Sequence, residues 1–143
     1  MKPNAKAPQS VLFLIELMIS FLVFAVTAAV CVRIFAGAHQ ISRQSEELSQ
    51  AVVFAQNAAE SLKSSRGDLE KAAGLLGGGT VSEDRLALCY DAEWALTDEA
   101  NAVYRLILTR SAPADGYMDA EAAVLRDGGQ IYQITFRVLE ESL

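Results

Sequence analysis

The chain has 143 residues, a formal net charge of −6 and 52% hydrophobic residues, a length that fits one small domain with additional segments. Its mean hydropathy of +0.22 is high for a soluble protein of this size, because apolar residues fill much of the first quarter of the chain. Acidic residues dominate after position 45 and no basic patch with interleaved aromatic residues occurs, so we expect no nucleic-acid partner for the folded part.

Residues 11–35 are expected to form a transmembrane helix, preceded by a short basic leader over residues 1–10. Glu16 is the only ionisable side chain between positions 7 and 32, and a helix needs about 20 apolar residues to cross a bilayer core. A carboxylate in hydrocarbon is costly unless it is paired, protonated or close to the lipid headgroups. Glu16 is therefore interpreted either as a tolerated interfacial residue or as a charge that docks on a neighbouring subunit.

The orientation of this helix is predicted from the charges that precede it, Lys2 and Lys6. Under the positive-inside rule they predict a cytoplasmic N-terminus, a single pass through the cell membrane and an extracytoplasmic C-terminal domain. A cleaved secretory signal is disfavoured, because its apolar core spans only about 7–15 residues. The sequence Ala28-Ala29-Val30-Cys31 leaves cleavage or lipidation there as an alternative.

The first turns of the helix carry the motif Phe13-Leu-Ile-Glu-Leu-Met-Ile19, next to the basic leader and within the apolar run. This combination resembles the methylation-type N-terminal helix of type IV pilins and type II secretion pseudopilins. In that family the glutamate is the fifth mature residue and neutralises the N-terminal amine of the adjacent subunit. The resemblance assigns this role to Glu16 and makes Leu12 the first mature residue. The family's peptidase cuts after glycine, where this chain has Val11, and the usual first mature residue is phenylalanine.

Residues 36–66 are expected to continue the helix as an amphipathic stalk. The segment has no proline and is rich in Gln, Glu, Ser and Ala, so we predict one continuous helix over residues 11–64, about 80 Å long. Apolar residues recur on one face at helical spacing, and this stripe packs either on the protein's own domain or between helices of an assembly. The stripe consists of Ile41, Leu48, Val52, Ala55, Ala59 and Leu62.

Residues 67–83 are predicted to contain a short helix and a glycine-rich linker. Gly67 suits a left-handed helix cap. Asp68 suits the N-cap of a helix over residues 69–76, and the glycines at 77–79 end that helix. These glycines are not a phosphate-binding loop, because no lysine followed by serine or threonine comes at the required spacing.

Residues 84–143 alternate apolar and polar side chains with a period of two, which is typical of half-buried strands. A small antiparallel meander of about four strands needs a cover for its apolar face. The sequence thus predicts an α+β fold in which the long N-terminal helix packs on this sheet, the architecture that the pilin resemblance implies. The expected strands are 85–90, 102–110, 117–126 and 130–140, with Asp127-Gly128-Gly129 as a hairpin connection and Trp94 covering the core.

Catalytic, metal and cofactor sites have little support in the sequence. The single histidine, His39, has no Cys/His cluster around it for zinc, and Cys31 and Cys89 are interpreted as small buried apolar residues. No nucleophile motif is present and no calcium loop has the right spacing, so we expect no enzyme, no cofactor and no small-molecule substrate. Five acidic residues of the C-terminal part are interpreted as solvated: Glu93, Asp98, Glu99, Asp115 and Asp119.

Two functions remain open from the sequence. The first is a structural subunit, resembling a pseudopilin or a minor type IV pilin, that associates with the lipid bilayer and with pilin-type subunits through its N-terminal helix. Such a subunit would serve a secretion, pilus or DNA-uptake apparatus. The second is an anchored extracytoplasmic adaptor that never polymerises, which Val11 at the glycine position favours.

Overall fold

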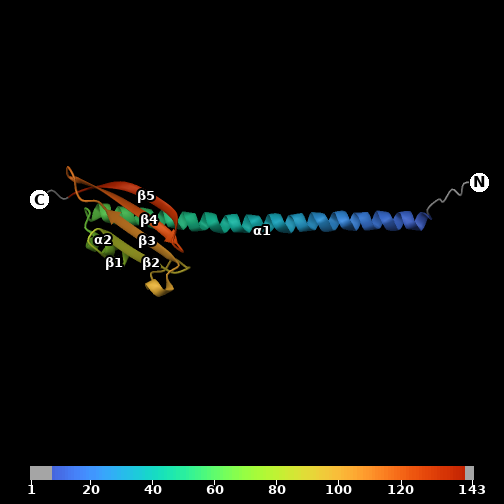
Figure 1. The fold of residues 1–143 in the computed structure, drawn as a ribbon, viewed down its shortest axis with the longest axis horizontal. Helices are drawn as coiled ribbons and strands as arrows, with labels where there is room; N and C mark the ends of the chain where they lie inside the picture. The colour runs from blue at the N-terminus through green and yellow to red at the C-terminus, as the bar shows by residue number, and fades with distance from the viewer. Residues whose placement is uncertain (1–7, 141–143) are drawn as a thin grey trace, which may run out of the picture. The chain divides into compact units, whose positions relative to one another are not determined.

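The computed structural model describes residues 8–140, and the chain divides into two compact units, Met1–Gln44 and Ser45–Leu143. The helix α1, Gln9–Ser64, contributes residues to both units (Figure 1). Its predicted end is confirmed, and it begins two residues before the predicted start. The leader lysines Lys2 and Lys6 lie outside the described residues.

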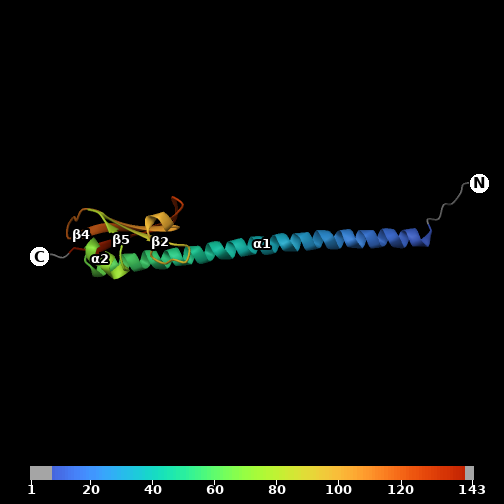
Figure 2. The same cartoon turned by 90° about the horizontal axis from the view of Figure 1, so that it is seen from below.

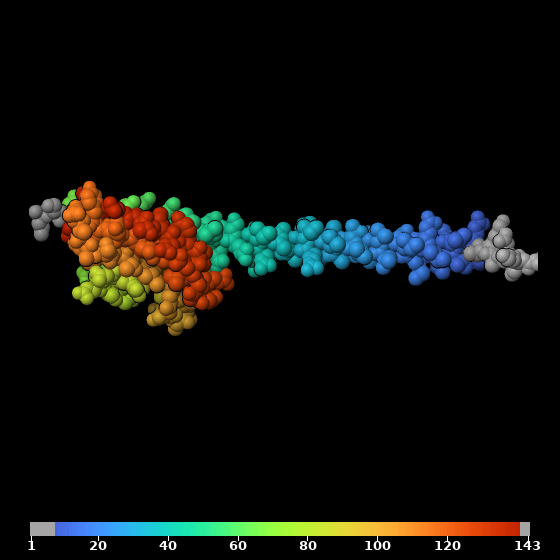
Figure 3. Space-filling view, turned by 45° about the horizontal axis from the view of Figure 1, so that its top comes forward, coloured from blue at the N-terminus to red at the C-terminus, as the bar shows by residue number. Residues whose placement is uncertain are grey.

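The described residues of the first unit all belong to α1, which Figure 3 draws in blue toward its N-terminal end. Every described residue of this unit is exposed. An 18-residue window of α1 has a mean hydropathy of 2.5 and 0% of it is buried. By length and composition, the helix is therefore long and apolar enough to cross a membrane.

α1 ends in a left-handed turn made by Arg66 and Gly67, with φ of 52° and 87°. The Gly67 N–H donates to the Leu62 carbonyl (2.9 Å) and the Arg66 N–H donates to the Lys63 carbonyl (3.1 Å). This is the bonding pattern of a Schellman motif. The left-handed conformation predicted for Gly67 is confirmed. Arg66 is also left-handed, because it occupies the position directly after the C-cap, where the Schellman motif requires a left-handed residue.

The helix α2, Leu69–Leu76, follows this turn and is capped at both ends as the sequence predicts. The Asp68 carboxylate accepts hydrogen bonds from the N–H groups of Glu70 (3.0 Å) and Lys71 (3.2 Å). These bonds, above all the one from the Lys71 N–H, hold the pKa of Asp68 below its ordinary value. At the other end Gly77 takes a left-handed φ of 90°.

The second unit contains a five-stranded antiparallel sheet in the order β1-β2-β3-β4-β5 (Figure 1). Its elements are β1 (Thr80–Val81), β2 (Arg85–Tyr90), the 3-10 helix η1 (Glu99–Asn101), β3 (Tyr104–Arg110), β4 (Tyr117–Arg126) and β5 (Gly129–Leu139). The prediction of four strands is corrected by β1, which lies in the segment assigned to the linker. Gly77, Gly78 and Gly79 all have positive φ, and they turn the chain so that Thr80 pairs with Ala87. A strand of two residues is too short to show a recognisable alternation of apolar and polar side chains in the sequence.

The apolar face of the sheet packs against the C-terminal part of α1 and against α2, which lie on the same side of it (Figure 2). The alternation predicted for β3 and β4 is confirmed, with buried residues toward the helices. On β5 the inward side chains of Tyr132, Ile134 and Phe136 are half-buried, and Val138 is buried. The sheet residues of the core cluster are Leu86, Leu88, Tyr90, Tyr104, Leu106, Leu108, Met118, Ala120, Ala122, Val124 and Val138.

α1 contributes mainly small side chains to this core. Ala51, Ala55 and Ala58 are fully buried, as is the larger Leu62. Alanine side chains let the helix backbone approach the sheet closely, and Leu62 fills the space near the end of the helix. The predicted stripe is confirmed from Ala55 onward.

The N-terminal part of the predicted stripe does not pack on the protein's own domain. Ile41 is 67% exposed and Leu48 is 45% exposed. Glu47 is the first half-buried residue of α1, and its carboxylate accepts from the Arg126 guanidinium (2.7 Å) at the hairpin end of β4. Packing of α1 on the sheet therefore begins after this contact, where the sheet itself begins.

Candidate functional site

The first candidate surface is the apolar part of α1 around Glu16, the only ionisable side chain in this stretch. The two nearby hydroxyl groups, of Ser20 and Thr27, donate hydrogen bonds to carbonyl groups of the same helix. Ser20 donates to the Glu16 carbonyl (2.9 Å) and Thr27 donates to the Val23 carbonyl, the usual bond of a helical hydroxyl to the preceding turn. The Glu16 carboxylate makes no ion pair within the described part of the chain.

The predicted processing junction, Val11 and Leu12, lies inside the first turns of α1. The N–H groups of both residues donate to the Pro8 carbonyl, at 2.8 Å and 3.4 Å. Both side chains are exposed. Leu12 lies one turn before Glu16 on the same face of the helix, because residues four apart are neighbours on a helix surface. The structure thus places the three predicted residues on one short stretch of helix.

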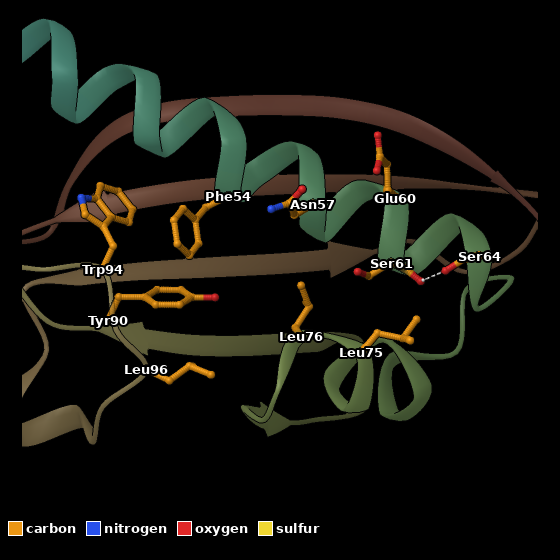
Figure 4. A pocket seen from close by; sticks show the side chains of 10 residues that line it. All are labelled: Phe54, Asn57, Glu60, Ser61, Ser64, Leu75, Leu76, Tyr90, Trp94 and Leu96. Carbon is orange, nitrogen blue, oxygen red and sulfur yellow. Dashed lines mark hydrogen bonds between the residues drawn. The ribbon is translucent and has the colours of Figure 1, made fainter.

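The second candidate surface is a groove of ≈ 680 Å³ in the second unit, which the sequence did not reveal. Figure 4 shows it between the C-terminal part of α1 on one side and α2 with β2 on the other. Sequence patterns do not detect it, because its walls come from α1, α2, β2 and the loop after β2, which only the tertiary fold brings together. It is lined by Phe54, Asn57, Glu60, Ser61, Ser64, Leu75, Leu76, Tyr90, Trp94 and Leu96.

An aromatic cluster closes one end of this groove. Trp94 stacks on Tyr104 with ring centroids 4.0 Å apart, and Phe54 meets Tyr90 edge-on at 4.8 Å. Phe54 also contacts Trp94, at 4.9 Å. The cluster joins α1, β2, β3 and the loop after β2, and such ring pairs each contribute about 0.5–1.5 kcal/mol beyond simple burial. The prediction that Trp94 covers the core is confirmed.

Trp94 reaches the cluster from a left-handed backbone position with φ of 62°, which is rare for a bulky residue. The Asp91 carboxylate holds this turn by accepting from the N–H groups of Glu93 (3.0 Å) and Ala95 (2.9 Å). The Trp94 N–H donates to the Asp91 carbonyl (3.1 Å). A strained position persists only when its surroundings over-determine it, and here the turn and the ring stacking do so.

Tyr90 forms part of the groove floor. The residue is 4% exposed, and its hydroxyl points along the groove toward Leu76 in Figure 4. Burial raises the pKa of Tyr90 to about 12, because the phenolate would lose its hydration. The phenol therefore stays neutral at ordinary pH and adds a hydrogen-bonding group to a groove that is also lined by Asn57 and Ser61.

One acidic side chain, Glu60, lines the groove from α1. Glu93 and Asp98 belong to the loop after β2 and are not among the lining residues. None of the three makes an ion pair within residues 8–140. Glu60 is thus the one charged side chain among the residues that line the groove.

The five acidic residues predicted to be solvated are all exposed. Two of them form surface ion pairs, Glu99 with Arg105 (2.6 Å) and Asp119 with Arg137 (2.9 Å). Pairs as exposed as these contribute little to stability. Among the described residues, no three His, Cys, Asp or Glu side chains come together in a group that could hold a metal ion.

The prediction that both cysteines are buried is wrong. Cys31 is exposed on α1 and Cys89 is half-buried, and both are free thiols. Cys89 alternates with the inward-facing Leu88 and Tyr90 on β2 and so points to the other face of the sheet. Cys31 belongs to the part of α1 that no described segment covers.

The described residues thus present an apolar stretch of helix whose carboxylate, Glu16, makes no ion pair among them, and a groove lined in part by aromatic side chains. Comparison with known proteins assigns no function to either surface. No protein-family model, no curated protein and no solved structure gives a significant match to this chain.

Proposed function

We propose that the protein is a membrane-anchored structural subunit of the pseudopilin or minor type IV pilin kind, and not an enzyme. It assembles with like or related subunits through the apolar part of α1 in a secretion, pilus or DNA-uptake apparatus. The observation that carries the proposal is the 18-residue window of mean hydropathy 2.5 with 0% of it buried, in which Glu16 is the only charge.

The role of Glu16 follows from the cost of its charge. A carboxylate on a membrane-spanning helix is stabilised only by a partner, by protonation or by access to water. The terminal amine of a neighbouring copy that begins at Leu12 would supply an opposite charge, and pairing would set the axial register between helices. The N-terminus of the helix faces the cytoplasm in this proposal, and the second unit lies outside the cell membrane.

The test is disulfide cross-linking of full-length protein in its native membranes. Single cysteines are placed at successive positions from Phe21 to Ala29 in a chain whose Cys31 and Cys89 are replaced by alanine. The proposal expects cross-linked multimers at the positions of one helix face. Glu16→Ala should lower their yield several-fold, whereas Ser20→Ala, one turn away, should leave it unchanged.

The second candidate is a single-pass anchored adaptor that does not polymerise. Val11 favours it, because the resembled family is processed after glycine and an unprocessed chain has no amine at Leu12. This candidate expects monomeric protein at every cysteine position of the scan, and no effect of Glu16→Ala.

A further inference from the structure

The two edges of the sheet are built differently. At one edge β1 has only two residues, and the loop after β2 covers the rest, since the Thr97 N–H donates to the Cys89 carbonyl (2.9 Å) and Leu96 bridges to Tyr90. At the other edge β5 runs for eleven residues without a proline (Figure 1). Short strands, proline and covering loops are the usual protection of a sheet edge. The first edge is protected in this way, and the β5 edge is not.

The backbone of β5 offers hydrogen-bonding groups on the side away from β4. The Glu140 N–H donates to the Gly116 carbonyl (2.9 Å), so Tyr117 and Leu139 are a non-hydrogen-bonded pair of the β4–β5 ladder. Such pairs alternate with hydrogen-bonded ones, so every second residue of β5 turns its N–H and C=O groups away from β4. In the regular part of the strand these residues are Gln133, Thr135 and Arg137.

These outward groups have no other backbone partner within residues 8–140. We call them the free-edge amides and carbonyls. The side chains of the same three residues are exposed on the outer face of the sheet. Only water or another extended chain can satisfy such a row of groups, and a strand of peptide does so with a regular ladder.

The side chains on the α1 side of β5 indicate what such a strand carries. Tyr132, Ile134 and Phe136 are only half-buried, so apolar side chains at alternate positions of an added strand would complete their cover. The Lys63 ammonium lies 5.4 Å from the centre of the Phe136 ring. Lys63 is exposed and makes no ion pair among the described residues.

A carboxylate in the added strand would therefore be stabilised beside Phe136. Side chains directly opposite each other on neighbouring strands have Cβ atoms about 4.5–5.5 Å apart, which brings such a group within reach of Lys63. Residues 129–139 contain no Asp or Glu. The β5 strand of a second copy therefore lacks the carboxylate, and a symmetric pair of β5 strands would leave both Lys63 side chains without one.

We propose that β5 binds an extended segment of another protein as an additional strand of the sheet. The segment bonds to the free-edge amides and carbonyls. It places apolar side chains beside Tyr132, Ile134 and Phe136, and an acidic side chain near Lys63. This inference goes beyond the proposed function, because it adds a partner for the second unit, and it applies equally to an anchored adaptor.

The test is hydrogen–deuterium exchange of the full-length protein, resolved to single residues, in native membranes and after purification as a monomer in detergent. The free-edge amides of Gln133, Thr135 and Arg137 should exchange about tenfold more slowly in native membranes. The amides of Ile134 and Phe136 bond to β4 and are the internal control, slow in both samples. Equal exchange of the free-edge amides in both samples overturns the proposal.

A proline at the free edge tests whether backbone bonding protects these amides. Thr135→Pro removes an N–H that makes no bond to β4, a position where an edge strand tolerates proline. The protection of Gln133 and Arg137 in native membranes should be lost, while Ile134 and Phe136 stay slow. Thr135→Val keeps the N–H and should keep the protection. Protection that survives Thr135→Pro contradicts strand addition.

Charge reversal tests the acidic partner residue. Lys63→Glu should lower the protection of the free-edge amides about fivefold, whereas Lys71→Glu, on α2, should leave it unchanged. Equal effects of the two changes contradict the carboxylate near Lys63.

A cysteine at the edge separates the occupants. In the Cys31→Ala, Cys89→Ala chain, Thr135→Cys should give no disulfide-linked homodimer on oxidation in native membranes. A homodimer would show that a second copy occupies the edge and would overturn the proposed partner. Cross-linking at Phe21 to Ala29 does not involve β5, so this inference and the proposed function can fail separately.

Discussion

At the scale of single residues, the join between α1 and the sheet depends on Gly67 and on one arginine. The Arg110 guanidinium donates to the Gly67 carbonyl and to the Glu83 carbonyl (3.3 Å). Its backbone N–H donates to the Asp84 carbonyl (3.0 Å). One residue of β3 therefore binds both the end of α1 and the turn before β2. The close approach of Gly67 to its neighbours follows from this arrangement.

Gly67→Ala should destabilise the second unit more than Gly128→Ala does. Both glycines have left-handed φ, of 87° and 79°, so each alanine has a backbone cost of about 1–2 kcal/mol. A Cβ at Gly67 would also collide with the end of the Met118 side chain, whereas nothing lies near a Cβ at Gly128. We expect a further loss of about 1 kcal/mol for Gly67→Ala.

The measurement is urea unfolding of detergent-solubilised full-length protein, followed by the fluorescence of Trp94, the single tryptophan. Equal losses in the two variants would show that Met118 moves aside without cost.

Asp68→Ala should lower the free energy of unfolding by about 1 kcal/mol through loss of the N-cap, whereas Asp68→Asn should nearly preserve it. The two variants also separate the cap from the charge. Because the folded pKa of Asp68 is lowered, the stability from its charge is complete above the unfolded pKa of about 3.9 and is lost as the pH falls through the folded value.

The stability difference between the original chain and Asp68→Asn should therefore shrink only below about pH 4. Chemical unfolding at a series of pH values measures it. A difference that shrinks near neutral pH would contradict the assignment to this carboxylate.

At the scale of elements, α1 has two surfaces of different kinds. From Ala51 onward it faces its own sheet with small side chains, and before Glu47 its apolar residues are exposed. A single helical periodicity runs through both parts. The same stripe therefore serves packing inside the molecule in one part and is available for contacts with other molecules in the other.

Leu62→Ala and Leu48→Ala test this division on one helix. Leu62 is 0% exposed and Leu48 is 45% exposed. Truncating a buried leucine costs about 2–5 kcal/mol, so Leu62→Ala should strongly destabilise the second unit. Leu48→Ala should cost less than about 1 kcal/mol. Trp94 fluorescence in urea measures both, and similar losses would mean that α1 packs on the sheet from Leu48 as well.

The fold could be predicted as far as local patterns extend. The alternation in β3 and β4, the Asp68 cap and the length of α1 each depend on residues close in sequence, and all were predicted. β1 was not, because its two residues gain their structure only by pairing with β2. The extent of the stripe at Ile41 and Leu48 depends on where the sheet ends, which periodicity does not encode.

The candidate site was predictable only in part for the same reason. Glu16 is conspicuous because it interrupts an apolar run, and the run itself is a local signal. The groove brings Phe54, Leu76 and Trp94 together from α1, α2 and the loop after β2. In the sequence each of these side chains is typical of a core residue, and the groove between them exists only because of the tertiary arrangement.

At the scale of the whole molecule, the chain combines an apolar helix bearing one carboxylate with a small acidic domain that has a groove. The proposed assembly uses Glu16 to set the register between helices in the membrane. Glu16→Gln should therefore reduce assembly nearly as much as Glu16→Ala, because both remove the charge. The cross-linking yield of a cysteine on the membrane helix measures this, and full assembly of Glu16→Gln would contradict a charge-based role.

The most direct measurement is the mass of the intact protein and of its N-terminal peptide, after purification from native membranes. The account predicts a mature chain that begins at Leu12, with a free amine available to the Glu16 of a neighbouring copy. A chain that retains Val11 and the leader would leave Glu16 without that partner. It would contradict assembly by this mechanism and favour the anchored adaptor that does not polymerise.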